Sequence, residues 1–126
     1  MKKLLFVFLM SVLAWQLEAQ TIEVLDFHST HRCRTCVSIE KSARAALESH
    51  FGQELAAGTV VFKTINVDDP QNARMAEQFE AAGSALWVYC PDTQAKVDLT
   101  DFAFMNIGNA EKFRQRIVAE VRKALS

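Results

Sequence analysis

The feature that most constrains the fold is a pair of cysteines, Cys33 and Cys36, at the start of a segment with helical periodicity. Residues 21–28, just upstream, are rich in β-formers and lead into a polar loop, which is typical of a strand. From residue 33 to residue 51, apolar or small side chains recur at helical spacing, and Gly52 is the expected stop. We therefore expect a strand, a loop and a helix that opens with the cysteine pair.

The rest of the chain continues this alternation of strands and helices. Asp69 before Pro70 is typical of a helix start, because an acidic N-cap precedes a proline at the first helical position. The stretch around Phe102 and Met105 is expected to be irregular, and Asn109 is expected to cap a final helix. The predicted strands span 21–28, 59–67, 84–90 and 96–99, and the predicted helices span 33–51, 70–81 and 109–125.

The order of elements is thus β-α-β-α-β-β-α, with no internal repeat. A helical crossover between the first two strands implies that they are parallel, and the short turn at Pro91 implies an antiparallel pair of third and fourth strands. This order predicts an α/β protein with the thioredoxin fold, a mixed four-stranded sheet with helices on both faces.

The N-terminal residues predict the compartment. Lys2 and Lys3 precede an apolar run over residues 4–15, and Ala19 provides a small residue for cleavage, which is typical of a secretory signal peptide. The run is shorter than the roughly 20 residues that a membrane-spanning helix needs. We therefore predict a signal peptide over residues 1–19, one thioredoxin-like domain over residues 20–126, and a secreted or periplasmic protein that is not inserted in the membrane after cleavage.

Charge and cysteine count narrow the classes of partner. The formal net charge is −1, and the sequence shows neither a basic patch that would bind nucleic acid nor a strong acidic bias. Three cysteines leave at most one intramolecular pair in a compartment where disulfides persist. Cys90 ends the third predicted strand, far from Cys33, so we expect a buried or half-buried free thiol, with intermolecular pairing as the alternative.

The placement of the pair predicts which cysteine reacts first. Unpaired backbone N–H groups at a helix start favour the thiolate form of Cys33, and the flanking Arg32 and Arg34 add positive charge. Cys33 would then attack a partner disulfide, and Cys36 would resolve the mixed disulfide. Glu40 falls one helical turn after Cys36, where it could accept the Cys36 proton or form an ion pair with Arg44.

Two other interpretations of the pair stay open. Thiolates and imidazoles bind soft ions, so Cys33, Cys36, His28 and His31 could hold a soft metal or trivalent arsenic. The pair could also be an inert structural disulfide. Structural zinc is disfavoured because a second Cys-x-x-Cys and an adjacent His-x-x-x-His are both missing.

The segment 27–40 reads Phe-His-Ser-Thr-His-Arg-Cys-Arg-Thr-Cys-Val-Ser-Ile-Glu, and residues 65–70 read Ile-Asn-Val-Asp-Asp-Pro. These motifs resemble the small exported thioredoxin-like proteins of the ArsF-type (nitrophenyl compound nitroreductase subunit) family. The resemblance implies a thiol-active domain that exchanges with protein thiols or disulfides. It also implies an association with arsenic-related systems and a membrane permease that shuttles reducing equivalents. No Gly-rich dinucleotide motif is present, so no cofactor beyond the Cys33–Cys36 disulfide is expected.

The chain also departs from typical thioredoxins. Arg32 stands where thioredoxins have a tryptophan before the pair, and Arg34-Thr35 stands where they have Gly-Pro within it. Gly83-Ser84-Ala85 stands where that fold carries a cis-proline. A non-proline cis bond costs about 2.5–4 kcal/mol, so we expect another loop geometry there. In thioredoxins a buried carboxylate on the first strand moves the proton of the resolving thiol. The resemblance gives that role to Asp26, with a solvated or ion-paired carboxylate as the alternative.

Overall fold

The protein is described here by a computed structural model that covers residues 20–126. The predicted signal peptide, residues 1–19, lies outside the described residues. The elements are β1 (Ile22–His28), α2 (Arg34–His50), α3 (Gly52–Ala57), β2 (Val60–Asn66), the 3₁₀ helix η1 (Pro70–Asn72), α4 (Ala73–Gln78), β3 (Ala85–Cys90), β4 (Ala95–Asp98), α5 (Thr100–Asn106) and α6 (Ala110–Leu125).

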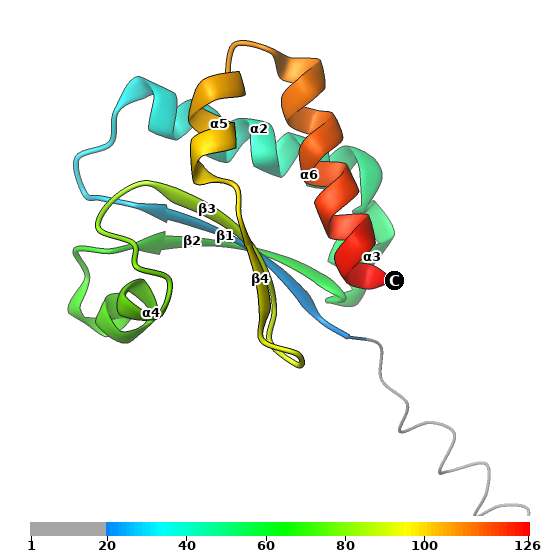
Figure 1. Cartoon of the computed structure of the whole chain (residues 1–126), viewed down its shortest axis with the longest axis horizontal. Coiled ribbons are helices and arrows are strands. Elements are labelled where there is room, and N and C mark those ends of the chain that lie inside the picture. Colours follow the sequence, from blue (N-terminus) through cyan, green and yellow to red (C-terminus); the bar gives the residue numbers. More distant parts are fainter. Residues whose placement is uncertain (1–19) are drawn as a thin grey trace, which may run out of the picture.

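The four strands form one mixed sheet in the order β2-β1-β3-β4. β1 and β2 are parallel, whereas β3 pairs antiparallel with both β1 and β4. α2, α5 and α6 lie on one side of the sheet and α4 lies on the other (Figure 1). The predicted α/β class, the thioredoxin-like order and the mixed sheet with helices on both faces are confirmed.

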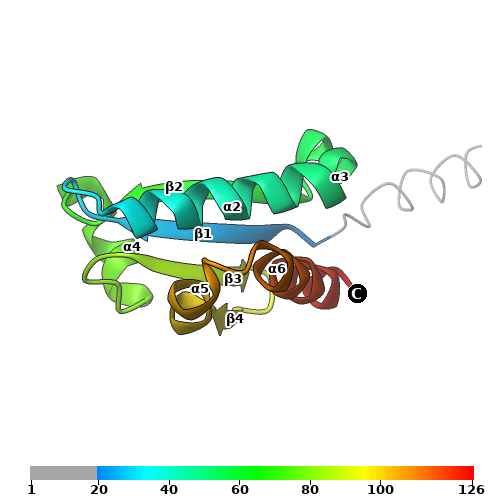
Figure 2. The same ribbon diagram turned by 90° about the horizontal axis from the view of Figure 1, so that it is seen from above.

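Alternation along β1 divides the interior into two cores. Ile22 and Val24 belong to the larger core, which β1 and β3 form with α2, α5 and α6. Leu25 and Phe27 belong to the smaller core under α4, where Phe79 packs against them. α2 runs along β1 with α5 and α6 beside it (Figure 2). Because side chains alternate along a strand, residue 26 faces the larger core, on the side of α2.

Two predicted helix ends differ from the structure. The first helix ends at His50, and Gly52 begins α3 instead of stopping the chain, because the buried Phe51 adopts a non-helical backbone with φ −131°. The helix predicted over 70–81 consists of η1 and α4 and ends at Gln78. Glu80 has φ 50°, and this left-handed residue closes the helix with a bond from Ala81 N to Ala76 O of 2.8 Å.

The prediction of an irregular stretch around Phe102 and Met105 is wrong, because these residues form α5. Asp98 accepts hydrogen bonds from the backbone and the hydroxyl of Thr100, which orders the first turn. Leu99 and Ala103, one turn apart, are both fully buried and attach this helix to the larger core. The predicted cap of the last helix is confirmed, since Asn109 Oδ1 accepts from Lys112 N at 3.2 Å.

Candidate active site

The cysteine pair forms a disulfide at the start of α2. The sulfurs of Cys33 and Cys36 are 2.12 Å apart and their Cα atoms 5.1 Å apart. Cys33 is the N-cap of the helix, and its Sγ accepts from Cys36 N at 3.0 Å. Cys33 is exposed, whereas Cys36 is half-buried. A reagent from solution therefore reaches Cys33 more easily than Cys36.

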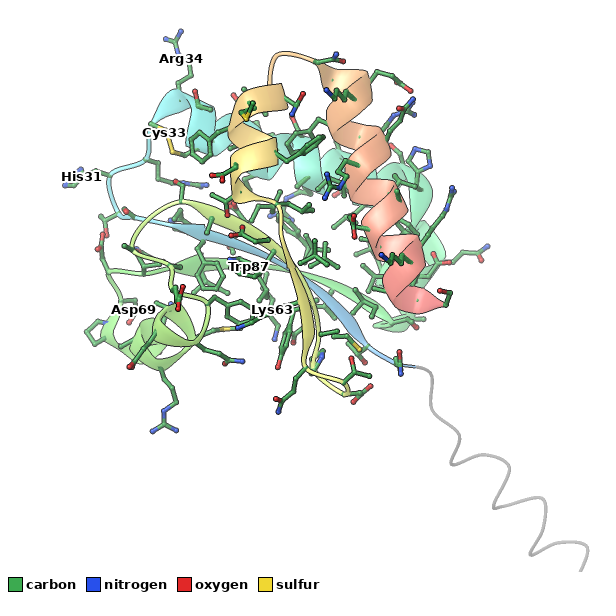
Figure 3. All side chains as sticks on the ribbon, viewed as in Figure 1. His31, Cys33, Arg34, Lys63, Asp69 and Trp87 are labelled. Carbon is green, nitrogen blue, oxygen red and sulfur yellow. A yellow bond between two sulfur atoms is a disulfide. The ribbon has the colours of Figure 1, made fainter. Side chains whose placement is uncertain are left out.

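The loop before the pair is attached to the end of the neighbouring strand. Val67 N donates to His28 O at 2.8 Å and extends the pairing of β1 with β2 by one bond. Thr30 N donates to Asp68 Oδ2 at 2.8 Å, and its hydroxyl accepts from Asn66 Nδ2 at 3.2 Å. These bonds place the start of α2 at the carboxyl end of β1. His31, Cys33 and Arg34 lie together at this end of the molecule (Figure 3).

Asp26 is the one charged side chain that is buried within residues 20–126, with 3% of its surface exposed. Asp26 lines a narrow crevice together with Cys36, Ser84 and Ala85. Burial raises the pKa of Asp26 to about 7 against the opposing effect of the Arg32 charge. The structure thus places beside Cys36 a carboxyl group that exchanges its proton near neutral pH.

Arg32 bridges the two acidic residues of the site. Its Nη2 lies 3.5 Å from Asp26 Oδ2, and its Nη1 lies 3.2 Å from Glu40 Oε1. The prediction of an ion pair between Glu40 and Arg44 is wrong, because Arg44 lies over the Phe62 ring at 4.8 Å. An ion pair was one of the alternatives expected for Asp26 and is present, whereas the sequence did not indicate Arg32 as the common partner of the acids on β1 and α2.

The two histidines singled out in the sequence lie at the end of β1 and in the loop before the cysteine pair. His28 is half-buried, with Nδ1 3.0 Å from Ser29 O, and His31 is exposed. Hydrogen bonds from Thr30 hold the pKa of Asp68 below its ordinary value, and the nearby His31 and His28 act in the same direction. Within residues 20–126, no three His, Cys, Asp or Glu side chains are grouped so that they could hold a metal ion.

The loop that faces Cys36 contains no proline. Ser84 and Ala85 line the crevice, and no cis peptide bond occurs in the part of the chain that the structure describes. Leu86 N donates to Thr100 Oγ1 at 3.1 Å, which ties this strand to α5. Phe104 of α5 lines the same crevice. The contribution of Phe104 could not be predicted from the sequence, because the stretch that forms α5 carries too short a helical pattern.

Cys90 lies at the other end of β3 from Ala85. The thiol is free and buried, with 4% of the residue exposed, and Sγ lies 3.8 Å from Gln20 Oε1. The prediction of a buried free thiol away from the reactive pair is confirmed.

The fold and the site together define a thioredoxin-like domain with a disulfide of Cys-x-x-Cys spacing, which fits a redox role. Comparison with known proteins gives no match, either to a protein family or to a curated sequence. None of the helices within residues 20–126 is long and apolar enough to cross a membrane.

Proposed function

We propose that this protein is a thiol–disulfide oxidoreductase or electron carrier that works outside the cytoplasm through Cys33 and Cys36. The observation that carries the proposal is the asymmetry of the pair. The sulfur of Cys33 is at an exposed helix start, whereas Cys36 faces the crevice that holds Asp26. An attacking thiol needs access, and a resolving thiol needs a group that takes its proton.

The reaction proceeds in two balanced steps. In the reduced protein the Cys33 thiolate attacks one sulfur of a partner disulfide, so that a mixed disulfide forms and the other partner sulfur leaves as a thiolate. The Cys36 thiolate then attacks Cys33 Sγ, the mixed disulfide breaks, and the second partner sulfur leaves. Two electrons pass from this protein to the partner, and the reverse sequence oxidises a partner dithiol.

Asp26 accepts the proton of Cys36 in the second step. A base with a pKa of about 7 is effective near neutral pH, because it is partly ionised and still binds a proton readily. Arg32 and Glu40 are positioning residues here, since they act on Asp26 through the ion-pair bridge. Glu40 itself remains the alternative acceptor on the same face of α2 as Cys36.

The basic and apolar N-terminal pattern supports export to the periplasm or beyond. The resemblance of segments 27–40 and 65–70 to the ArsF-type family supports partners that are protein thiols or disulfides. It also supports a membrane permease that supplies or drains electrons.

The test is exchange with dithiothreitol, a neutral dithiol, followed for the native protein and for three variants. We expect a measurable equilibrium with the native protein and none with Cys33→Ser. Cys36→Ser, treated instead with glutathione disulfide, should accumulate a mixed disulfide at Cys33, because neither the variant nor glutathione supplies a resolving thiol in the same molecule. Cys90→Ser is the matched control and should exchange as the native protein does. Unchanged exchange in Cys33→Ser would refute the proposal.

A further inference from the structure

An exposed apolar pair lies on the helix that borders the reactive disulfide. Within residues 20–126, the exposed large apolar side chains are Phe104, with 40% of its surface exposed, and Met105, with 83%. They are consecutive in α5, and Phe104 lines the crevice together with Cys36. Neighbouring apolar side chains beside a reactive group are typical of an interaction site, and methionine adapts to varied partners.

The surface next to Cys33 is cationic. Arg32 is engaged by Asp26 and Glu40, but Arg34 is exposed and forms no ion pair in the described part of the chain. His31 and Arg34 point away from the body of the molecule on either side of Cys33 (Figure 3). A partner segment that reaches Cys33 therefore meets the positive charge of Arg34 at the start of α2. It meets apolar surface on α5.

We propose that Phe104, Met105 and Arg34 form a docking surface for an extended, disulfide-bearing polypeptide. The partner cysteine would have an acidic residue on one side and an apolar residue on the other. This inference rests on the proposed function and adds the class of partner. The acidic residue pairs with Arg34, the apolar residue covers Phe104 and Met105, and the partner sulfur then lies at Cys33.

The charges favour this occupant over a second copy of the chain. In a symmetric dimer the patch would have to pair with itself, and Arg34, its charged member, would find no acidic residue of the patch on the other copy. Like charges at an interface oppose association. An acidic partner segment removes this repulsion and supplies the missing counter-charge.

The test uses full-length Cys36→Ser protein, in which Cys33 is the accessible thiol, and single-cysteine peptides activated with thionitrobenzoate. Cys33 attacks the peptide sulfur, a protein–peptide disulfide forms, and the coloured thionitrobenzoate leaves. Two peptides carry aspartate on one side of the cysteine and leucine on the other, one peptide for each order. The comparison peptides replace aspartate by lysine or leucine by serine. We expect the aspartate–leucine peptide to react about fivefold faster than either comparison peptide.

Variants then assign each preference to its side chain. Met105→Ser should reduce the leucine-over-serine preference about fivefold, and Arg34→Glu should reverse the preference for aspartate over lysine. Each result is a ratio of two peptides on one variant, so changes in the intrinsic reactivity of Cys33 cancel. Ala119→Ser and Arg122→Glu, at exposed positions of α6, are the matched controls and should leave both ratios unchanged.

The outcomes separate this inference from the proposed function. Peptide preferences that are absent, or that persist in Met105→Ser and Arg34→Glu, overturn the docking surface. The proposed function stands in that case if the native protein still exchanges with dithiothreitol. If neither the peptides nor dithiothreitol react with Cys33, the proposed function itself fails.

Discussion

Replacing Asp26 by asparagine should change how the stability of the protein depends on pH. The pKa of this carboxyl rises from 3.8 to about 7 in the folded state, chiefly because of burial. The folded protein therefore binds a proton on Asp26 that the unfolded chain has released. This contribution is fully present below the lower pKa and is lost as pH rises through the higher one.

The magnitude follows from the interval between the two pKa values. Each pH unit is worth about 1.4 kcal/mol, so the interval from 3.8 to about 7 corresponds to about 4 kcal/mol. That is a large share of the roughly 5–15 kcal/mol that stabilises a domain. Asparagine has a similar shape and does not titrate. The free energy of unfolding of Asp26→Asn, minus that of the native protein, should rise by about 4 kcal/mol between about pH 4 and about pH 8.

The assay is urea unfolding of the oxidised proteins, followed by circular dichroism across this pH range. Other titrating groups are common to both proteins, so the difference isolates the contribution of Asp26. Asp101→Asn, at an exposed position of α5, is the matched control for the substitution itself and should not reproduce this rise. If the difference for Asp26→Asn changes by less than about 1 kcal/mol, the carboxyl titrates near its ordinary pKa and the reasoning is wrong.

Three further predictions concern single contacts. Arg32→Gln removes a charge that lowers the pKa of Asp26, so the midpoint of the pH profile for the Cys36 resolving step should move upward, with partial rescue by Arg32→Lys. Glu80→Gly relieves a left-handed backbone at an exposed position and should raise the free energy of unfolding by about 1 kcal/mol, measured by urea unfolding. Asn109→Ala removes the cap of α6 and should lower the free energy of unfolding by about 1 kcal/mol in the same assay.

The sheet could be predicted from the sequence because its signals are local and mutually consistent. Residues 22–28 and 85–90 are rich in apolar and β-branched side chains, and their interior positions alternate between the two cores. The helical crossover and the short turn then determine which strands are parallel. Cys33 at the helix start was also predictable, because its spacing to Cys36 matches one helical turn and the strand ends just before it.

The helix α5 and the bridge at Arg32 could not be predicted in the same way. The buried positions of α5 and its N-cap are Ala103 and Leu99, which span a single helical turn. A pattern of one turn is too short to show helical periodicity in the sequence. The bridge joins Arg32 to Asp26, six residues before it, and to Glu40, eight residues after it. The i,i+4 spacing favoured Arg44 as the partner of Glu40, but the path of the loop brings Arg32 to the Glu40 carboxylate instead.

The position of Arg32 links the loop to the proton on Asp26. Burial and the Glu40 charge raise the pKa of that carboxyl, whereas the charges of Arg32 and Arg44 lower it, and together they give a value of about 7. Arg32 directly precedes Cys33, so the side chain that lowers the pKa of Asp26 lies next to the proposed attacking cysteine. Withdrawal of Arg32 favours the protonated carboxyl, and its approach favours the carboxylate. In the proposed reaction, the bridge therefore helps to determine how readily Asp26 takes up the proton of Cys36.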